Sequence, residues 1–378
     1  MRRMVHPPMQ AGWIDSPHHE LPLGDFPLES GEVIRDFHLC YALHGATGPL
    51  QPGALRGAGN VVLALSAIGS THHRLDFLIG SGRALDPREV IVIAVDAIGN
   101  GLTTSPSTSA LQPGNAFPSF NIRDMVASQL ALIDHLGIGR LRCVIGASMG
   151  GMQALQWAVS HGERIERLVA MTPMARTTPW AAVINETSRR ALLADPNALE
   201  LDALGPRAFD PGPLDPDAAV SGARPNAGWA AWVPLMHLIS GRTPAQIDRE
   251  FTSPADVLDW IGRRTRWWTD QGFDAIDWIY QSRAYDAHDV GLTPGFTGDT
   301  DRALASVTVP ALILAPPLDL YNPAHEARAV AARMPAARFV EIPSDWGHQA
   351  ASPADPAAAD LLNRLIGRFL DGDPGAEP

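Results

Sequence analysis

The sequence predicts an α/β fold with a doubly wound, mostly parallel sheet that is interrupted by a helical insertion. Short apolar, β-branched runs alternate with helical segments over most of the 378 residues, and this alternation is typical of parallel sheets covered by helices on both faces. The alternation stops between Thr172 and about Asp301. There, prolines and glycines break up helical segments that hold seven of the ten tryptophans, which indicates an insertion.

The predicted strands run from an antiparallel pair at the start of the chain into a parallel sheet. Residues Gly31–Gly45 have the pattern of the opening pair. Apolar runs suited to buried strands follow at Asn60–Ala64, Val90–Val95, Arg140–Ile145, around Ile165, Val309–Ala315 and Ala337–Pro343. Between them, Ile122–Leu136 carries apolar residues at helical spacing and stops at Gly137, so it predicts a helix.

The loss of strand–helix alternation after Thr172 predicts how the chain divides into domains. We expect residues 1–172 and 302–378 to form one catalytic domain, and residues 173–301 to form a helical lid inserted into it. Ligand pockets are mostly apolar and often lie at such junctions, so the tryptophans of the insertion, Trp180 and Trp232 among them, are predicted to line a substrate pocket. The simpler alternative is that they build only the small core of the insertion.

Composition restricts the partners. The net charge is −12, from 29 basic and 41 acidic residues without a basic cluster, so we expect small molecules rather than nucleic acid or anionic membrane. A signal-peptide core and long apolar runs are missing, so we expect a cytoplasmic protein.

The cysteines give no sign of a metal site. Cys40 and Cys143 lie in strand candidates, and zinc-type spacing is missing. We therefore expect buried thiols, no metal and no organic cofactor.

A serine framed by glycines is the main chemical signal. Gly146, Ser148 and Gly150 fit G-x-S-x-G, between a strand candidate and the helical run Met152–Val159. In this arrangement small neighbours allow a sharp strand-to-helix turn that exposes the serine hydroxyl at the top of a sheet. The alternative is an ordinary tight turn. The order strand, serine, helix favours a nucleophile elbow with Ser148 as the nucleophile.

A serine nucleophile needs a histidine base and a carboxylate that orients the base, here in the chain order Ser, Asp, His. Asp319 and His348 satisfy this order, and each lies in a loop just past a predicted strand. We therefore predict Ser148, Asp319 and His348 as a catalytic triad.

Other candidates for these roles occur among the acids and the 13 histidines. Asp96 also ends a strand and is the rival acid, whereas Asp345 is close to the predicted base in the chain. His72 and His73 follow an early strand and precede the serine, so they are candidates for lining the pocket rather than for the base.

Acyl transfer also requires two backbone N–H donors for the tetrahedral oxyanion. One comes from the residue after the nucleophile, which is Met149. The other is expected from the loop Leu65–Gly69 after an early strand, with Ala67 or Ile68 as the donor and Ala67 as our choice.

Three segments are distinctive beyond the serine motif: GASMGGMQALQWA at Gly146–Ala158, FPSFNIRDMV at Phe117–Val126, and DHLGI at Asp134–Ile138. Together they resemble the homoserine O-acetyltransferase family of α/β-hydrolases. The resemblance covers most of the chain. It implies the α/β-hydrolase fold, a Ser148, Asp319, His348 triad with a ping-pong acyl-enzyme mechanism, and a homodimer formed through lid helices.

The chain departs from that family where the amino acid would bind. Gln349 stands after the predicted base where the homoserine enzymes have an aspartate, and Val233 stands where they have an arginine for the carboxylate. Unpartnered buried charges cost about 3 kcal/mol or more, so homoserine is disfavoured. The segments Gly99–Ser107, Ile79–Gly80 and Ala84–Pro87 instead look like the branch of the family that hydrolyses esters.

We therefore expect a serine carboxylic ester hydrolase that acts on short-chain esters, acetyl esters in particular, of uncharged alcohols. Its pocket is predicted to include Ile68, Trp180, Trp232 and Gln349. The alternative is an acyl-CoA dependent O-acetyltransferase with an acceptor other than homoserine. Hydrolysis of amides, lactones or carbon–carbon bonds on the same triad stays open, as does a non-catalytic binding protein built on this scaffold.

Overall fold

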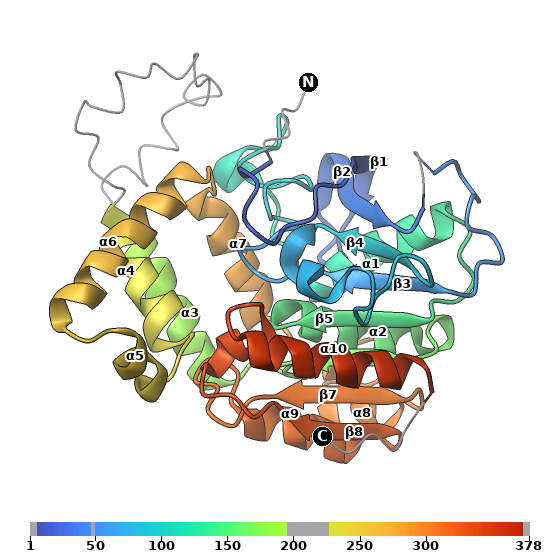
Figure 1. The fold of residues 1–378 in the computed structure, drawn as a ribbon. Coiled ribbons are helices and arrows are strands. Elements are labelled where there is room, and N and C mark those ends of the chain that lie inside the picture. Colours follow the sequence, from blue (N-terminus) through green and yellow to red (C-terminus); the bar gives the residue numbers. More distant parts are fainter. Residues whose placement is uncertain (1–5, 47–49, 195–226, 373–378) are drawn as a thin grey trace.

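The computed structural model describes residues 6–46, 50–194 and 227–372, and these contain an eight-stranded sheet (Figure 1). The strand order is β1-β2-β4-β3-β5-β6-β7-β8, with antiparallel pairs β1–β2 and β2–β4 and parallel pairs elsewhere. The strands are β1 (His18–Pro27), β2 (Val33–His44), β3 (Val61–Leu65), β4 (Ile91–Val95), β5 (Cys143–Ala147), β6 (Leu168–Met171), β7 (Ala311–Ala315) and β8 (Ala337–Glu341). The predicted doubly wound, mostly parallel sheet is confirmed.

Three strand predictions need correction. The segment Gly31–Gly45 supplies one strand, β2, and its antiparallel partner is β1, whose sequence HHELPLGDFP is polar and contains two prolines. An edge strand tolerates such residues because one side of its backbone has no strand beside it. The strand expected at Arg140–Ile145 begins at Cys143, and the strand expected around Ile165 begins at Leu168. Leu141 and Ile165 pair only through an isolated bridge.

Helices cover both faces of the sheet, as Figure 1 shows. They are α1 (Ile122–His135), α2 (Met149–His161), α3 (Pro179–Leu193), α4 (Ala227–Val233), α5 (Pro244–Glu250), α6 (Pro254–Asp270), α7 (Ala275–Asp286), α8 (Thr300–Ala305), α9 (Ala324–Arg333) and α10 (Pro356–Leu370). Side chains of α1 and α2 pack with Leu63 and Val144, whereas those of α10 pack with Val62 and Ile145. Neighbouring residues of one strand therefore enter different cores.

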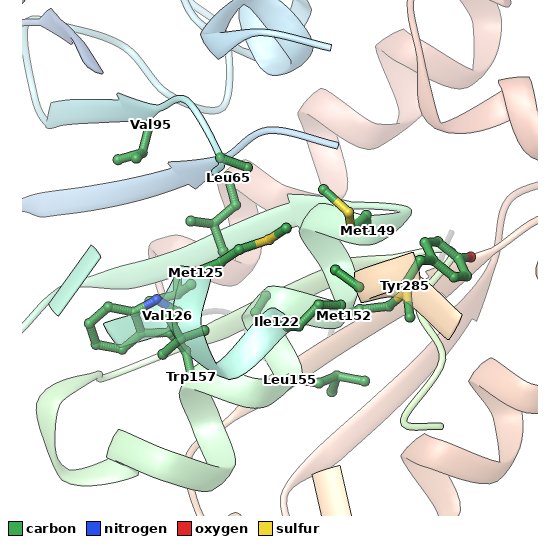
Figure 2. Packing of buried hydrophobic residues seen from close by; sticks show 14 of the residues in the cluster. Leu65, Val95, Ile122, Met125, Val126, Met149, Met152, Leu155, Trp157 and Tyr285 are labelled. Carbon is green, nitrogen blue, oxygen red and sulfur yellow. The ribbon is translucent and has the colours of Figure 1, made fainter. Parts of the chain in front are cut away.

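The helix predicted at Ile122–Leu136 is confirmed as α1, and α1 packs against α2. Asn121 caps α1 in a capping box with Asp124, which satisfies free N–H groups at the helix start. Apolar side chains of α1 and α2 meet in one cluster, and Figure 2 shows Trp157 of α2 among them. The Trp157 Nε1 donates to Gln129 Oε1 at 2.7 Å. This packing fixes the helix that follows Ser148.

The helices α3 to α7 lie in the chain between β6 and β7, and Figure 1 shows α3 to α6 gathered beside the sheet. This arrangement fits an insertion. The division into a catalytic domain of residues 1–172 and 302–378 and a lid of residues 173–301 stays a prediction, because residues 195–226 lie outside the described part. Among the described residues, none of the helices combines the length and apolar character needed to cross a membrane.

Candidate active site

Ser148 lies at a sharp turn between β5 and α2. Its φ of 58° and ψ of −124° are unusual for a residue with a side chain, and such strain is typical of a nucleophile elbow. A Cβ at Gly146 would lie 2.1 Å from the Gly150 carbonyl oxygen, and one at Gly150 would lie 2.6 Å from that of Leu65. The G-x-S-x-G glycines are therefore needed for close approach of backbone segments.

The three residues of the predicted triad meet in the structure. His348 Nε2 lies 2.9 Å from Ser148 Oγ, and His348 Nδ1 lies 2.7 Å from Asp319 Oδ2. All three side chains are buried. The spacing places a base on the hydroxyl and a carboxylate on the far ring nitrogen, which is the arrangement that activates serine.

A network of hydrogen bonds fixes the acid. Asp319 Oδ1 accepts from the backbone N–H groups of Tyr321 and Asn322, each at 2.8 Å. The Asn322 Nδ2 donates to the Thr172 carbonyl at 2.7 Å, and the Tyr285 hydroxyl donates to Asn322 Oδ1. The acid loop is therefore anchored to the end of β6. Sequence reasoning missed these supporting side chains, because their partners lie far away in the chain.

The rival acids have other partners. Asp96 Oδ2 lies 2.9 Å from His72 Nδ1, and its second oxygen accepts from Asn100 Nδ2 at 2.8 Å. Asp345 is bound to the Arg249 guanidinium, and this hydrogen bond holds the pKa of the Asp345 carboxyl below its ordinary value. The structure therefore brings Asp319 to the base and pairs Asp96 and Asp345 with other side chains.

The candidate oxyanion donors lie on either side of the serine. Met149 is the first residue of α2, so its N–H has no partner within the helix. The Ala67 N–H donates to Ser70 Oγ at 2.8 Å, so this donor is engaged within its own loop. Within the described part of the chain, the Ile68 N–H has no hydrogen-bond acceptor. Ile68, the second candidate from the sequence, is therefore the donor that is available.

The helix α7 holds the loop that carries Ala67 and Ile68. The Gly69 N–H donates to Gln281 Oε1 at 3.1 Å, and Gln281 Nε2 donates to the Ile98 carbonyl at 3.1 Å. A Cβ at Gly69 would lie 3.0 Å from the ring of Trp278, so α7 packs directly on the loop. The insertion thereby sets the position of the expected oxyanion loop.

The tryptophans of the insertion form an aromatic cluster next to this loop. Trp232 is buried, with ring centroids 4.7 Å from Trp278 and 4.9 Å from Trp268. Trp268 Nε1 donates to His237 Nε2 at 2.7 Å. Through Trp278 the cluster reaches the loop that contains Ile68, so it builds a core and also lies against the site.

The two other predicted pocket residues lie near the acid and the base. Trp180 is 53% exposed, and its Nε1 donates to the Leu320 carbonyl. It lines a cavity of about 590 Å³ together with Asp319 and Leu320. Gln349 follows the base, and its N–H donates to the Gly241 carbonyl at 3.1 Å. Trp180 is therefore next to the acid loop and Gln349 next to the base, whereas Trp232 reaches the loop that contains Ile68 only through Trp278.

Comparison with known proteins identifies the family. A family model described as alpha/beta hydrolase fold matches residues 69–351. The homoserine O-acetyltransferase of Trichormus variabilis is 30% identical over 342 residues, which cover 88% of this chain and 89% of that protein. The chain belongs to the α/β-hydrolase family. The resemblance to its homoserine O-acetyltransferase members is thus confirmed.

Solved α/β-hydrolase structures share the fold. An acetylester hydrolase from Corynebacterium glutamicum superposes with a TM-score of 0.79 at 22% identity, covering 94% of this chain and 96% of that one. The acetyl esterase MekB gives a TM-score of 0.78 at 25% identity, and the match covers 94% of this chain and 97% of that one. Relatives of this α/β-hydrolase thus include proteins named as transferases and proteins named as esterases.

Proposed function

We propose that this α/β-hydrolase is a serine carboxylic ester hydrolase that acts on short-chain esters, acetyl esters in particular, of uncharged alcohols. The observation that carries the proposal is the continuous hydrogen-bonded chain from Ser148 Oγ through His348 to Asp319. In acyl transfer the serine attacks the ester carbonyl while the histidine takes its proton, and the aspartate orients the imidazole.

The remaining steps use the same groups. The oxyanion accepts hydrogen bonds from the Met149 N–H and from an N–H of the loop Leu65–Gly69. His348 gives the proton to the leaving alcohol as the tetrahedral intermediate collapses, which releases the alcohol and leaves the acyl group on Ser148. Water then attacks the acyl group, with the histidine as base, and the carboxylic acid leaves as Ser148 regains its proton.

The side chains at two positions support an uncharged alcohol. Gln349, beside the base, carries no charge, and Val233 is fully buried in the apolar core. The family resemblance implies an acid and an arginine at these places in the enzymes that bind homoserine. Burying an amino acid without such partners would leave both of its charges unpaired, which is costly.

A second candidate is an acyl-CoA dependent O-acetyltransferase with a different alcohol acceptor. The 30% identity to a homoserine O-acetyltransferase over 88% of this chain favours it. Both reactions use the same acyl-enzyme, so they differ in whether water or a bound alcohol reaches it. The resemblance also leads us to propose a homodimer through helices of the insertion, which light scattering would test.

Turnover of p-nitrophenyl esters of increasing acyl length tests the proposal, with and without acetyl-CoA and a panel of uncharged alcohols. The Ser148→Ala variant is the control for non-enzymatic hydrolysis. Fast hydrolysis that depends on Ser148 and does not respond to the alcohols supports the esterase. Slow hydrolysis with rapid acetyl transfer from acetyl-CoA to an alcohol would overturn it in favour of the transferase.

A further inference from the structure

Four histidines gather at a place that the triad does not use. They are His6, His18, His72 and His73, and one nitrogen from each lies within 4.8 Å of the others. His72 and His73 are buried, whereas His6 and His18 are half-buried. They come from the N-terminal segment, from β1 and from the short helix η1 (His72–Leu78). We call them the histidine cluster.

Two buried carboxylates orient the inner histidines. The Nδ1 of His72 lies 2.9 Å from Asp96 Oδ2, and the Nδ1 of His73 lies 2.7 Å from Asp76 Oδ2. A carboxylate on Nδ1 keeps the proton on that nitrogen and leaves the lone pair on Nε2. This carboxylate–histidine arrangement is the one that orients imidazoles as metal ligands.

An unpaired nitrogen points to a ligand. Within the described residues, His72 Nε2 is buried and has no hydrogen-bond partner. His6 Nε2 lies 3.0 Å from His73 Nε2, and Trp13 stacks on the His73 ring with centroids 4.2 Å apart. A hydrogen bond between the Nε2 atoms of His6 and His73 explains that pair, but it leaves the buried lone pair of His72 unused.

We propose that the histidine cluster is a closed, four-coordinate site for a divalent transition-metal ion, with Zn²⁺ as the best match. Imidazole nitrogens suit zinc, copper and nickel, and four protein ligands around one tetrahedral ion are typical of structural sites. Nitrogens at about 2.0–2.1 Å from such an ion lie roughly 3.3–3.4 Å apart. The four nitrogens lie within 4.8 Å of one another, so binding would require small rotations of the half-buried His6 and His18.

The position of the site favours a structural role. The Asp96 that orients His72 also accepts from Asn100, whose Nδ2 donates to the Ser70 carbonyl at 3.2 Å. A bound ion would join the N-terminal segment and β1 to the helix that follows the oxyanion loop. A metal was not expected from the sequence, because positions 6, 18, 72 and 73 lack the short paired spacing of familiar zinc sites.

Metal content and thermal stability of the untagged full-length protein test the proposal. The protein is stripped with EDTA, titrated with Zn²⁺ and dialysed, and Co²⁺ serves as a spectroscopic probe of tetrahedral geometry. The double variant H6Q/H18Q removes two half-buried ligands. The control is His19→Gln, the neighbouring position on β1, whose ring lies against Tyr41. Circular dichroism shows whether each variant is folded.

We expect one zinc per chain and a higher Tm with zinc in the wild type and in His19→Gln. In H6Q/H18Q the affinity falls at least tenfold and the Tm shift is lost. Asp76→Asn should lower the affinity about 10- to 100-fold, as other second-sphere changes do. A folded wild type that retains no zinc, or a double variant that binds zinc as tightly as His19→Gln, would overturn the proposal. Hydrolysis at Ser148 is not part of these readouts.

Discussion

His348 Nε2 lies 2.9 Å from Ser148 Oγ, although 200 positions separate these residues in the chain. The sheet explains the approach. Ser148 follows β5, whereas Asp319 and His348 follow β7 and β8, and these strands are parallel. Because loops after parallel strands gather at one edge of a sheet, the fold brings the three side chains together.

The role of the acid predicts the effect of Asp319→Asn. An amide in place of the carboxylate keeps the size of the side chain but stabilises the wrong histidine tautomer. We expect kcat for ester hydrolysis to fall by about 10⁴-fold with little change in KM. Steady-state kinetics on a p-nitrophenyl ester measure both. Asp345→Asn is the control and should keep wild-type kcat, since Asp345 pairs with Arg249. Equal losses of kcat in the two variants would contradict the assignment of Asp319 as the acid of the triad.

The close approach at the elbow predicts that Gly146→Ala destabilises the protein. The added methyl group would lie 2.1 Å from the Gly150 carbonyl, so backbone must move, at a cost of about 1–3 kcal/mol or more. Urea unfolding measures this. The matched control is Gly139→Ala, where a Cβ would meet nothing within 4 Å. If both variants unfold like the wild type, the elbow is less tightly packed than described.

The contact between α7 and the oxyanion loop predicts that Gln281→Met slows turnover. The change keeps the length of the side chain but removes its hydrogen bonds to the Gly69 N–H and the Ile98 carbonyl. We expect kcat to fall about 10- to 100-fold, since small displacements of catalytic groups have effects of this size. Ser282→Ala, on the same helix, is the control for stability. A destabilised Gln281→Met with wild-type kcat would show that α7 does not position the loop.

Acid should weaken one ion pair at the start of α1. The hydrogen bond from Arg123 and a second from Asn121 hold the pKa of Glu29 below its ordinary value of 4.5. The folded state therefore gains stability from the carboxylate above that value and loses it as pH falls through the lower folded pKa. Glu29 is partly exposed, so we expect less than about 1 kcal/mol.

Urea unfolding between about pH 7 and pH 3 measures this pair. The wild type should exceed Glu29→Gln in unfolding free energy at neutral pH, and the difference should shrink toward acid. A difference that grows as the pH falls would contradict the sign derived for the Glu29 carboxyl.

Features that follow directly after an apolar strand could be predicted from the sequence. Ser148 and Asp319 come just past the fully buried strands β5 and β7, and His348 follows the more exposed strand β8. The chain order reduced the choice of acid and base further. The strand β1 was missed because its polar residues suit an edge strand but give no alternating pattern. The signal for a strand in the buried sheet is hydrophobicity, and β1 lacks it.

Supporting contacts could not be predicted. Gly69 and Gln281 are 212 positions apart, and a glutamine that joins α7 to a distant loop gives no local signal in the sequence. The histidine cluster likewise depends on His18 of β1 lying beside His72 of η1. Because β1 was not predicted, this contact could not be predicted either. The engagement of the Ala67 N–H by Ser70 is set by loop geometry, so the choice between Ala67 and Ile68 needed coordinates.

The role of Ser148 as the nucleophile is tested most directly by the mass of the protein during turnover of p-nitrophenyl acetate, with rapid acid quench and peptide mapping. We expect one acetyl group on the peptide that contains Ser148. It should form within the burst of p-nitrophenol and disappear when the ester is exhausted. The Ser148→Ala variant should show neither burst nor acetyl group. An acetyl group on another residue, or rapid hydrolysis by Ser148→Ala, would contradict the assignment of Ser148 as the nucleophile.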